Sequence, residues 1–127
     1  MKLPQTLGKY TLTRKLGQGA TSTVYLGFDP FAKRDVAIKI LKQEILNDPK
    51  MGKLYQRQLD NEASLAGKLS HPHIVAIYDA LIGDDSSYVV MEYVSGGTLE
   101  RHAEPNDLLP IDRVVEYMFK CCRALNY

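Results

Sequence analysis

The feature that most constrains the fold is a set of three segments with alternating side chains, separated by short turns. Alternation of this kind is typical of half-buried β-strands. In the third segment Val36 and Ile38 share one face, whereas Ala37 and Lys39 share the other. Short connections favour an antiparallel meander. The three predicted strands are residues 10–17, 23–28 and 34–42.

The remainder of the chain adds helices and two further strands. Asn47 or Asp48 can cap a long helix, with Pro49 in its first position, where the missing N–H costs nothing. The predicted elements after that helix are strands 74–82 and 86–94, a short helix at about 98–104, and an amphipathic helix at 110–127. The predicted fold class is α+β, with a five-stranded antiparallel sheet, one long helix against it, and one or two helices beyond.

Composition narrows the classes of partner. The 127 residues are 45% hydrophobic and 24% charged, with a formal net charge of +1. Nucleic acids and anionic membranes select a concentrated basic face, so neither is expected as the main partner. No apolar run approaches the roughly 20 residues that cross a bilayer. Cys121 and Cys122 are adjacent and cannot readily pair with each other, which favours a reduced, cytoplasmic protein.

A glycine-rich turn joins the first two predicted strands. It runs from Gly17 through Gly19 to Ser22 and would let backbone N–H groups approach phosphate oxygens without a side chain in the way. An ordinary hairpin is the alternative. No Gly-Lys-Ser/Thr follows, so the turn is not a Walker A loop. It leads into a strand and not a helix, so it is not a Rossmann turn.

Lys39 is the most informative single residue. It lies between Ile38 and Ile40, and a buried lysine without a partner is costly. On the long helix, Glu62 is the one carboxylate within a stripe of otherwise apolar character. That stripe is Tyr55, Leu59, Glu62, Ala66 and Leu69. We therefore predict that Lys39 and Glu62 form an ion pair; an exposed edge-strand lysine is the alternative.

A second set of residues, at the end of the fifth predicted strand and in the first three strands, indicates a binding site only when the residues are considered together. Met91 to Val94 end the fifth predicted strand, just before Gly96 and Gly97. Taken singly, they are a strand end followed by a turn, and Leu16, Val24 and Ala37 are ordinary core residues. His71 and His73 lack further ligands in the sequence nearby, so turn and packing roles are expected and no metal site is predicted.

With the glycine-rich turn, Val36-Ala37-Ile38-Lys39 and Met91-Glu92-Tyr93, the chain resembles eukaryotic-like serine/threonine protein kinases of the bacterial branch. The resemblance implies an N-terminal extension at 1–9, a kinase small lobe at 10–94, and the hinge exit with an incomplete large lobe at 95–127. It implies ATP as the ligand, a protein substrate, and Lys39 paired with Glu62 as catalytic residues. The residues implied to bind ATP are Leu16, Gly17, Gln18, Gly19, Ala20, Val24, Ala37, Lys39, Met91, Glu92 and Val94.

The chain departs from the family pattern in two places. Ser22 stands at the third glycine position, which restricts the turn. No His-Arg-Asp or Asp-Phe-Gly sequence occurs, so these residues supply neither the catalytic base nor the magnesium ligands. We expect the isolated chain to lack turnover. The alternative function is a non-catalytic interaction module, which docks a partner or forms a homodimer through its long helix and the apolar stripe of helix 110–127.

Overall fold

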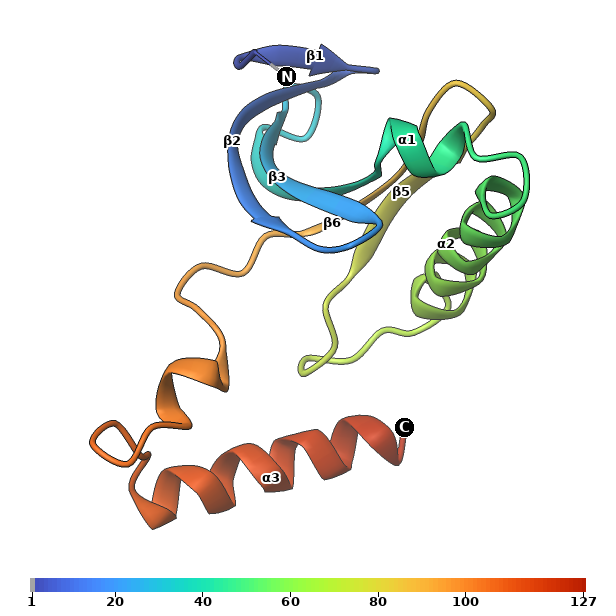
Figure 1. The fold of residues 1–127 in the computed structure, drawn as a ribbon. Coiled ribbons are helices and arrows are strands. Elements are labelled where there is room, and N and C mark those ends of the chain that lie inside the picture. Colours follow the sequence, from blue (N-terminus) through green and yellow to red (C-terminus); the bar gives the residue numbers. More distant parts are fainter. Residues whose placement is uncertain (1) are drawn as a thin grey trace.

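The computed structural model describes residues 2–127, and its central feature is one curled antiparallel sheet (Figure 1). The strand order is β1-β2-β3-β4-β6-β5, so the chain forms a meander up to β4 and inserts β6 between β4 and β5. The strands are β1 (Gln5–Leu7), β2 (Tyr10–Gln18), β3 (Ser22–Asp29), β4 (Arg34–Leu41), β5 (Ile77–Ile82) and β6 (Ser87–Glu92).

The five predicted strands are present, but the sheet has a sixth. Residues 5–7, expected to be an N-terminal extension, form β1 and pair with β2 at the edge of the sheet. A strand of three residues is too short to show a recognisable alternation. The strands predicted at 74–82 and 86–94 are shorter than expected, since regular pairing runs only over Ile77–Ile82 and Ser87–Glu92.

The sheet curls around its first hydrophobic cluster. Tyr10 and Leu12 of β2 are buried there with residues of β4 and β6. The hydroxyl of Tyr10 donates a hydrogen bond to Asp79 of β5 at 2.9 Å, although β3, β4 and β6 separate these strands in the sheet. The curl is therefore strong enough to bring β2 into contact with β5, the edge strand at the far side of the sheet. The members of the cluster are Tyr10, Leu12, Val36, Ile38, Tyr88 and Val90.

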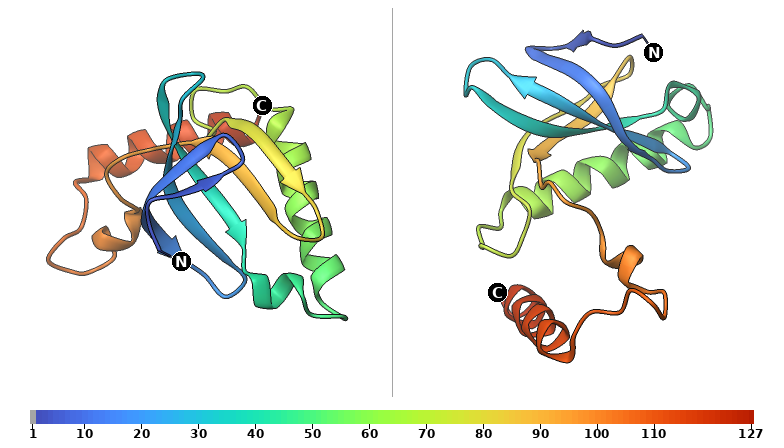
Figure 2. Two further views of the ribbon diagram at one scale, coloured as in Figure 1. Left: turned by 90° about the horizontal axis from the view of Figure 1, so that it is seen from above. Right: turned by 90° about the vertical axis from the view of Figure 1, so that its left-hand side faces the viewer.

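Helix α2 (Gly52–Gly67) covers the other face of the sheet (Figure 2). A second cluster fills the interface and includes Leu59 and Ala63 of the helix with Leu41 and Val89 of the sheet. We call this side of the sheet the α2 face. Because Ala37 pairs with Met91 and Lys39 pairs with Val89, alternate residues of β4 point to it. The predicted division of the strand into two faces is confirmed.

The start of α2 differs from the prediction. Pro49 lies in a turn, and the helix begins at Gly52. The carboxylate of Asp48 accepts hydrogen bonds from the backbone N–H groups of Lys50 and Met51, at 2.8 and 2.9 Å. Asp48 therefore organises the turn before the helix instead of capping a helix that begins at Pro49. A short unpredicted helix, α1 (Gln43–Leu46), precedes this turn.

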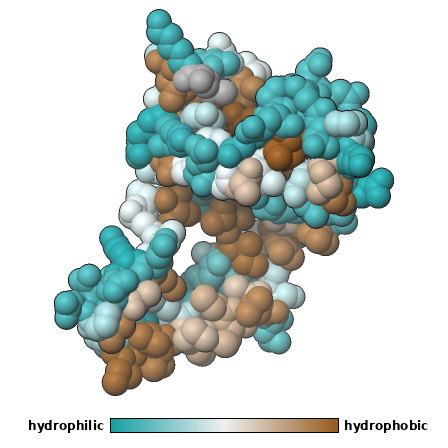
Figure 3. Space-filling view, in the orientation of Figure 1, coloured by the Kyte–Doolittle hydropathy of each residue, from teal (hydrophilic) through white to brown (hydrophobic). Residues whose placement is uncertain are grey.

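The chain after β6 makes a looser arrangement. The segment 93–98 leads to the short helix η1 (Leu99–His102), which Thr98 caps, and then to α3 (Ile111–Leu125). No residue of α3 is buried. Its predicted apolar stripe is present and uncovered: Val115, Met118 and Phe119 are 58–62% exposed, and apolar side chains gather over this part of the molecule (Figure 3). Across residues 2–127, none of the helices combines the length and apolar character that crossing a membrane requires.

Candidate nucleotide-binding site

Strand β4 and helix α2 bring Lys39 and Glu62 together, as predicted. Lys39 Nζ lies 3.0 Å from Glu62 Oε2 and 3.2 Å from Oε1, so the ammonium contacts both carboxylate oxygens. The side chains are 29% and 55% exposed, respectively. Both side chains are therefore only partly buried, and Glu62 is the more exposed of the two. A partly exposed pair of this kind remains accessible to a charged ligand.

The exposure of Glu62 follows from the orientation of α2. The helix buries Gly52, Gln56, Leu59 and Ala63, which recur at spacings of three and four residues. Glu62 precedes Ala63 and so lies at the edge of this buried face. Of the predicted stripe, Leu59 is the one residue among these buried positions. The buried face is thus rotated from the predicted stripe, and the carboxylate reaches Lys39 from its border.

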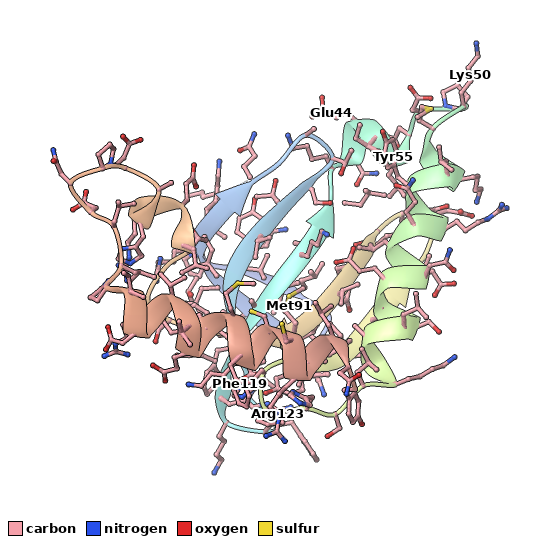
Figure 4. The ribbon with its side chains drawn as sticks, turned by 90° about the horizontal axis from the view of Figure 1, so that it is seen from below. Glu44, Lys50, Tyr55, Met91, Phe119 and Arg123 are labelled. Carbon is pink, nitrogen blue, oxygen red and sulfur yellow. The ribbon has the colours of Figure 1, made fainter. Side chains whose placement is uncertain are left out.

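Strand register places several predicted binding residues beside Lys39. Val24 of β3 pairs directly with Lys39, and Gly17 of β2 pairs with Val24. Ala37, two positions along β4 from Lys39, pairs with Met91 of β6. Paired residues share a face, so Val24, Ala37 and Met91 all lie on the α2 face with the lysine. Figure 4, drawn from below, shows Met91 projecting from this side of the sheet.

Two irregularities in β2 change which of its side chains face the site. The register shifts between Leu12 and Arg14, and again between Lys15 and Gly17. Arg14 therefore pairs with Leu26, on the α2 face, while Leu12 pairs with Gly27 and enters the cluster of the opposite face. Simple alternation predicted that Tyr10, Leu12, Arg14 and Leu16 share one face. That prediction fails because each β-bulge adds a residue to the strand.

The turn between β2 and β3 is short and open. The N–H of Gly19 donates to the carbonyl of Ser22 at 2.8 Å, which closes the turn, and Gln18, Gly19 and Ala20 are exposed. A Cβ added to Gly17 would meet no atom within 4 Å. The backbone here is thus free of side-chain cover. The turn is predicted from its residues to approach phosphate, and its exposure is compatible with that role.

The segment after β6 lies at the far end of the same face. Glu92, the last residue of β6, is tied to Ala76, which precedes β5: its N–H donates to the carbonyl of Ala76 at 2.9 Å, and its carboxylate accepts from the N–H of Ala76 at 3.1 Å. Val94 is 63% exposed. Tyr93 accepts a hydrogen bond from Arg14 at 3.2 Å, which links β2 to this segment. Sequence reasoning did not predict this contact between Arg14 and Tyr93.

Cavities in the structure do not by themselves locate a nucleotide. Beside the ion pair lies a cavity of about 80 Å³, too small for a ligand of that size. A larger hollow of about 330 Å³ lies between η1 and α3, far from Lys39, and its lining includes Leu99, Leu108, Val114 and Met118. This lining includes no lysine or arginine that could pair with phosphate. The partly exposed ammonium of Lys39, and not cavity size, therefore marks the candidate site.

Comparison with known families agrees with this geometry. The protein kinase domain family matches residues 10–127, which is nearly the entire chain. This chain belongs to the protein kinase family. The match extends from β2, through the ion pair and the segment after β6, to the end of α3.

Curated relatives specify the branch of the family. The chain is 42% identical to the serine/threonine-protein kinase PrkC of Bacillus subtilis over 118 residues, which are 93% of this chain and 18% of PrkC. It is 35% identical to the serine/threonine-protein kinase PknB of Mycobacterium leprae over an alignment of 128 positions, which covers 98% of this chain and 20% of PknB. The chain therefore spans about a fifth of the length of these relatives.

Solved structures show the same likeness in three dimensions. The kinase domain of Mycobacterium tuberculosis PknI superposes with a TM-score of 0.78 at 28% identity, covering 98% of this chain and 49% of that one. The chain thus corresponds to the N-terminal part of a bacterial eukaryotic-like serine/threonine kinase. It comprises the small lobe and part of the large lobe.

Proposed function

We propose that the α2 face beneath the β2–β3 turn binds ATP. The Lys39–Glu62 pair carries this proposal, because it presents a cation that is oriented by a carboxylate and still partly exposed. In this arrangement Lys39 would contact the α- and β-phosphates, and backbone N–H groups from Gly17 to Ala20 would approach the phosphates from above. Glu62 would orient the lysine without contacting the nucleotide.

The adenine would lie farther along the same face. Val24 and Ala37 are adjacent to Lys39 in the strand register, and Met91 is paired with Ala37, so they would form apolar walls, with Leu16 above. The backbone groups of Glu92 and Val94 would meet the polar edge of the base. The parent reaction would be transfer of the ATP γ-phosphate to a serine or threonine of a protein.

Calorimetric titration with ATP tests the binding proposal. Lys39→Met removes the cation, and we expect ATP affinity to fall about tenfold or more, since a charge-assisted contact to phosphate contributes roughly 1.5–3 kcal/mol. Lys120→Met is the matched control, because Lys120 is also ion-paired, to Glu116 on α3. Equal affinity of the Lys39 variant and the native chain would contradict the proposal.

We further propose that these 127 residues alone do not transfer phosphate. Transfer requires a positioned nucleophile and magnesium bound between the phosphates, and the chain has no His-Arg-Asp or Asp-Phe-Gly sequence to provide them. Incubation with radiolabelled ATP and a generic acceptor protein should give no labelled product. Labelling that disappears in Lys39→Met would overturn this proposal.

A second candidate function is an interaction module that acts without catalysis. The observation that favours it is the uncovered apolar face of α3, which includes Val115 and Phe119. Exposed apolar patches often mark protein–protein contacts. Light scattering separates the two candidate functions. A dimer whose measured mass changes neither with ATP nor with Lys39→Met favours the interaction module. A monomer that binds ATP favours nucleotide binding.

A further inference from the structure

The buried polar side chain of α2 is Gln56, which is 7% exposed. Its Nε2 donates a hydrogen bond to the carbonyl oxygen of Gly83, at 2.7 Å, in the turn between β5 and β6. Ser87 is fully buried, and its Oγ donates to the same carbonyl at 2.9 Å and accepts from the Gly83 N–H at 3.2 Å. One carbonyl thus receives donors from the helix and from the sheet. We call Gln56, Gly83 and Ser87 the Gly83 latch.

The latch lies in the half of α2 that is most firmly held. A Cβ added to Gly52 would approach the carbonyl oxygen of Leu46 to 2.5 Å, so α1 and the first turn of α2 are in close contact. Leu59, three residues after Gln56, is also buried, in the cluster between the helix and the sheet. In the other half of the helix Leu65 is 66% exposed. The beginning of α2 is therefore fixed to its surroundings at several points, and its end at fewer.

Glu62 lies after these points, in the half of α2 where Ala63 is the one buried residue. It follows Gln56 by six residues, or about 9 Å along the helix axis. Its ion pair with Lys39 is partly exposed to water, and pairs of this kind contribute little to holding an element in place. The pair therefore depends on the position of α2 more than it determines that position. A small rotation of the helix about its fixed half would separate the two charges.

We propose that Gln56 is a positioning residue that holds α2 where Glu62 reaches Lys39. It acts through the Gly83 carbonyl and does not touch the nucleotide. The consequence for ATP rests on the proposed function, but the consequence for the ion pair does not. A glutamine suits this role because its amide spans the distance to the turn and places no charge in a buried interface.

A double-mutant cycle tests the proposal. Gln56→Met keeps the length and volume of the side chain but removes the donor. We expect it to weaken ATP binding about fivefold in the native background, the effect of losing one buried hydrogen bond. In a Glu62→Gln background, where the pair is already weakened, Gln56→Met should change affinity less than about twofold. The same factor in both backgrounds would mean a merely structural role and would overturn the proposal.

A second readout needs no nucleotide. The acylation rate of Lys39 by an amine-reactive reagent, followed by peptide mass spectrometry, reports how free the ammonium is. Gln56→Met should raise that rate several-fold, and should raise it no further once Glu62→Gln is present. An unchanged acylation rate of Lys39 in Gln56→Met would overturn the proposed positioning role of Gln56. If the native chain binds no ATP, the proposed function fails, and the acylation result still decides the role of Gln56.

Two further variants complete the design. Asn61→Met is the matched control, because Asn61 is an exposed amide on the same helix and should affect neither readout. If Gln56→Met does not fold, Gln56→Asn replaces it: that amide is one methylene too short to reach Gly83 and should reproduce both effects. Melting curves establish that every variant is folded at the temperature of the assays.

Discussion

The sheet with α2 and the segment that carries α3 differ in how their helices are held. Helix α2 buries Leu59 and Ala63 against the sheet and is tied to a turn by Gln56. Helix α3 is the more amphipathic in sequence, yet buries no residue. Helices of this length are marginal in water unless an apolar face is packed. A regular apolar stripe therefore predicts a helix but does not show what covers it.

This difference separates the two candidate functions. The proposed nucleotide site is assembled within the packed region, from β2, β3, β4, β6 and α2. The module function depends on α3 and on the surface that it leaves open. Measurements of the stability of the sheet with α2, and of α3, therefore test whether the two regions are held as differently as the structure indicates.

The largest expected contrast comes from truncating one leucine in each helix. Leu59 of α2 is 4% exposed and Leu125 of α3 is 88% exposed. Leu59→Ala should lower the free energy of unfolding by about 2–4 kcal/mol, since it removes buried methyl groups and leaves a cavity. Leu125→Ala should change it by less than about 0.5 kcal/mol. Urea denaturation followed by circular dichroism measures both, and equal losses would abolish the distinction between the regions.

Hydrogen exchange should show the same contrast without mutation. Amides of β4 lie in the middle of the sheet between two hydrophobic clusters, whereas α3 has no buried side chain. We expect α3 amides to exchange about 100-fold faster than those of β4, relative to unstructured rates, because local opening there exposes little apolar surface. Equal protection of α3 and β4 would show that α3 is stabilised by contacts that its exposed side chains do not reveal.

A smaller effect is expected from alkaline pH on the sheet. Burial, and next the hydrogen bond to Asp79, raise the pKa of Tyr10 well above its ordinary value. Above pH 10 the unfolded chain loses the phenolic proton while the folded chain keeps it. The free energy of unfolding should therefore fall by about 1.4 kcal/mol per pH unit from this residue.

Tyr10→Phe provides the control for that titration. Burial also raises the pKa of Tyr88, helped by the charge of Asp79, so the native slope contains more than one contribution. The difference in free energy of unfolding between the native chain and Tyr10→Phe isolates the contribution of Tyr10. If that difference stays constant between pH 8 and pH 11, the phenol titrates alike in the folded and unfolded chain, which would contradict the prediction.

Sequence reasoning predicted the Lys39–Glu62 ion pair better than it predicted the boundaries of elements. The Lys39–Glu62 pair was predictable because two isolated charges of opposite sign stood in apolar patterns. Neither the exposure of Glu62 nor the position of Arg14 could be predicted. The first depends on how α2 is rotated, and the second on bulges in β2, and both are set by tertiary packing.

Other features of the fold could not be predicted from the local sequence. Strand β1 is three residues long, and α1 is a single turn of four. Helix α2 starts at Gly52 because the side chain of Asp48 accepts hydrogen bonds within the preceding turn. Asp48 therefore does not serve as the cap of a helix that starts at Pro49. The Gly83 latch joins residues 27 positions apart, and a glutamine within a helical pattern ordinarily indicates an exposed face.

Mapping ATP on the chain by amide NMR tests the central claim most directly, because it reports both regions in one titration. We predict saturable shifts at Gly19, Lys39 and Val94, which surround the proposed site, with the amides around Phe119 of α3 unmoved. Shifts confined to α3, or no saturable shift at all, would contradict nucleotide binding beneath the β2–β3 turn.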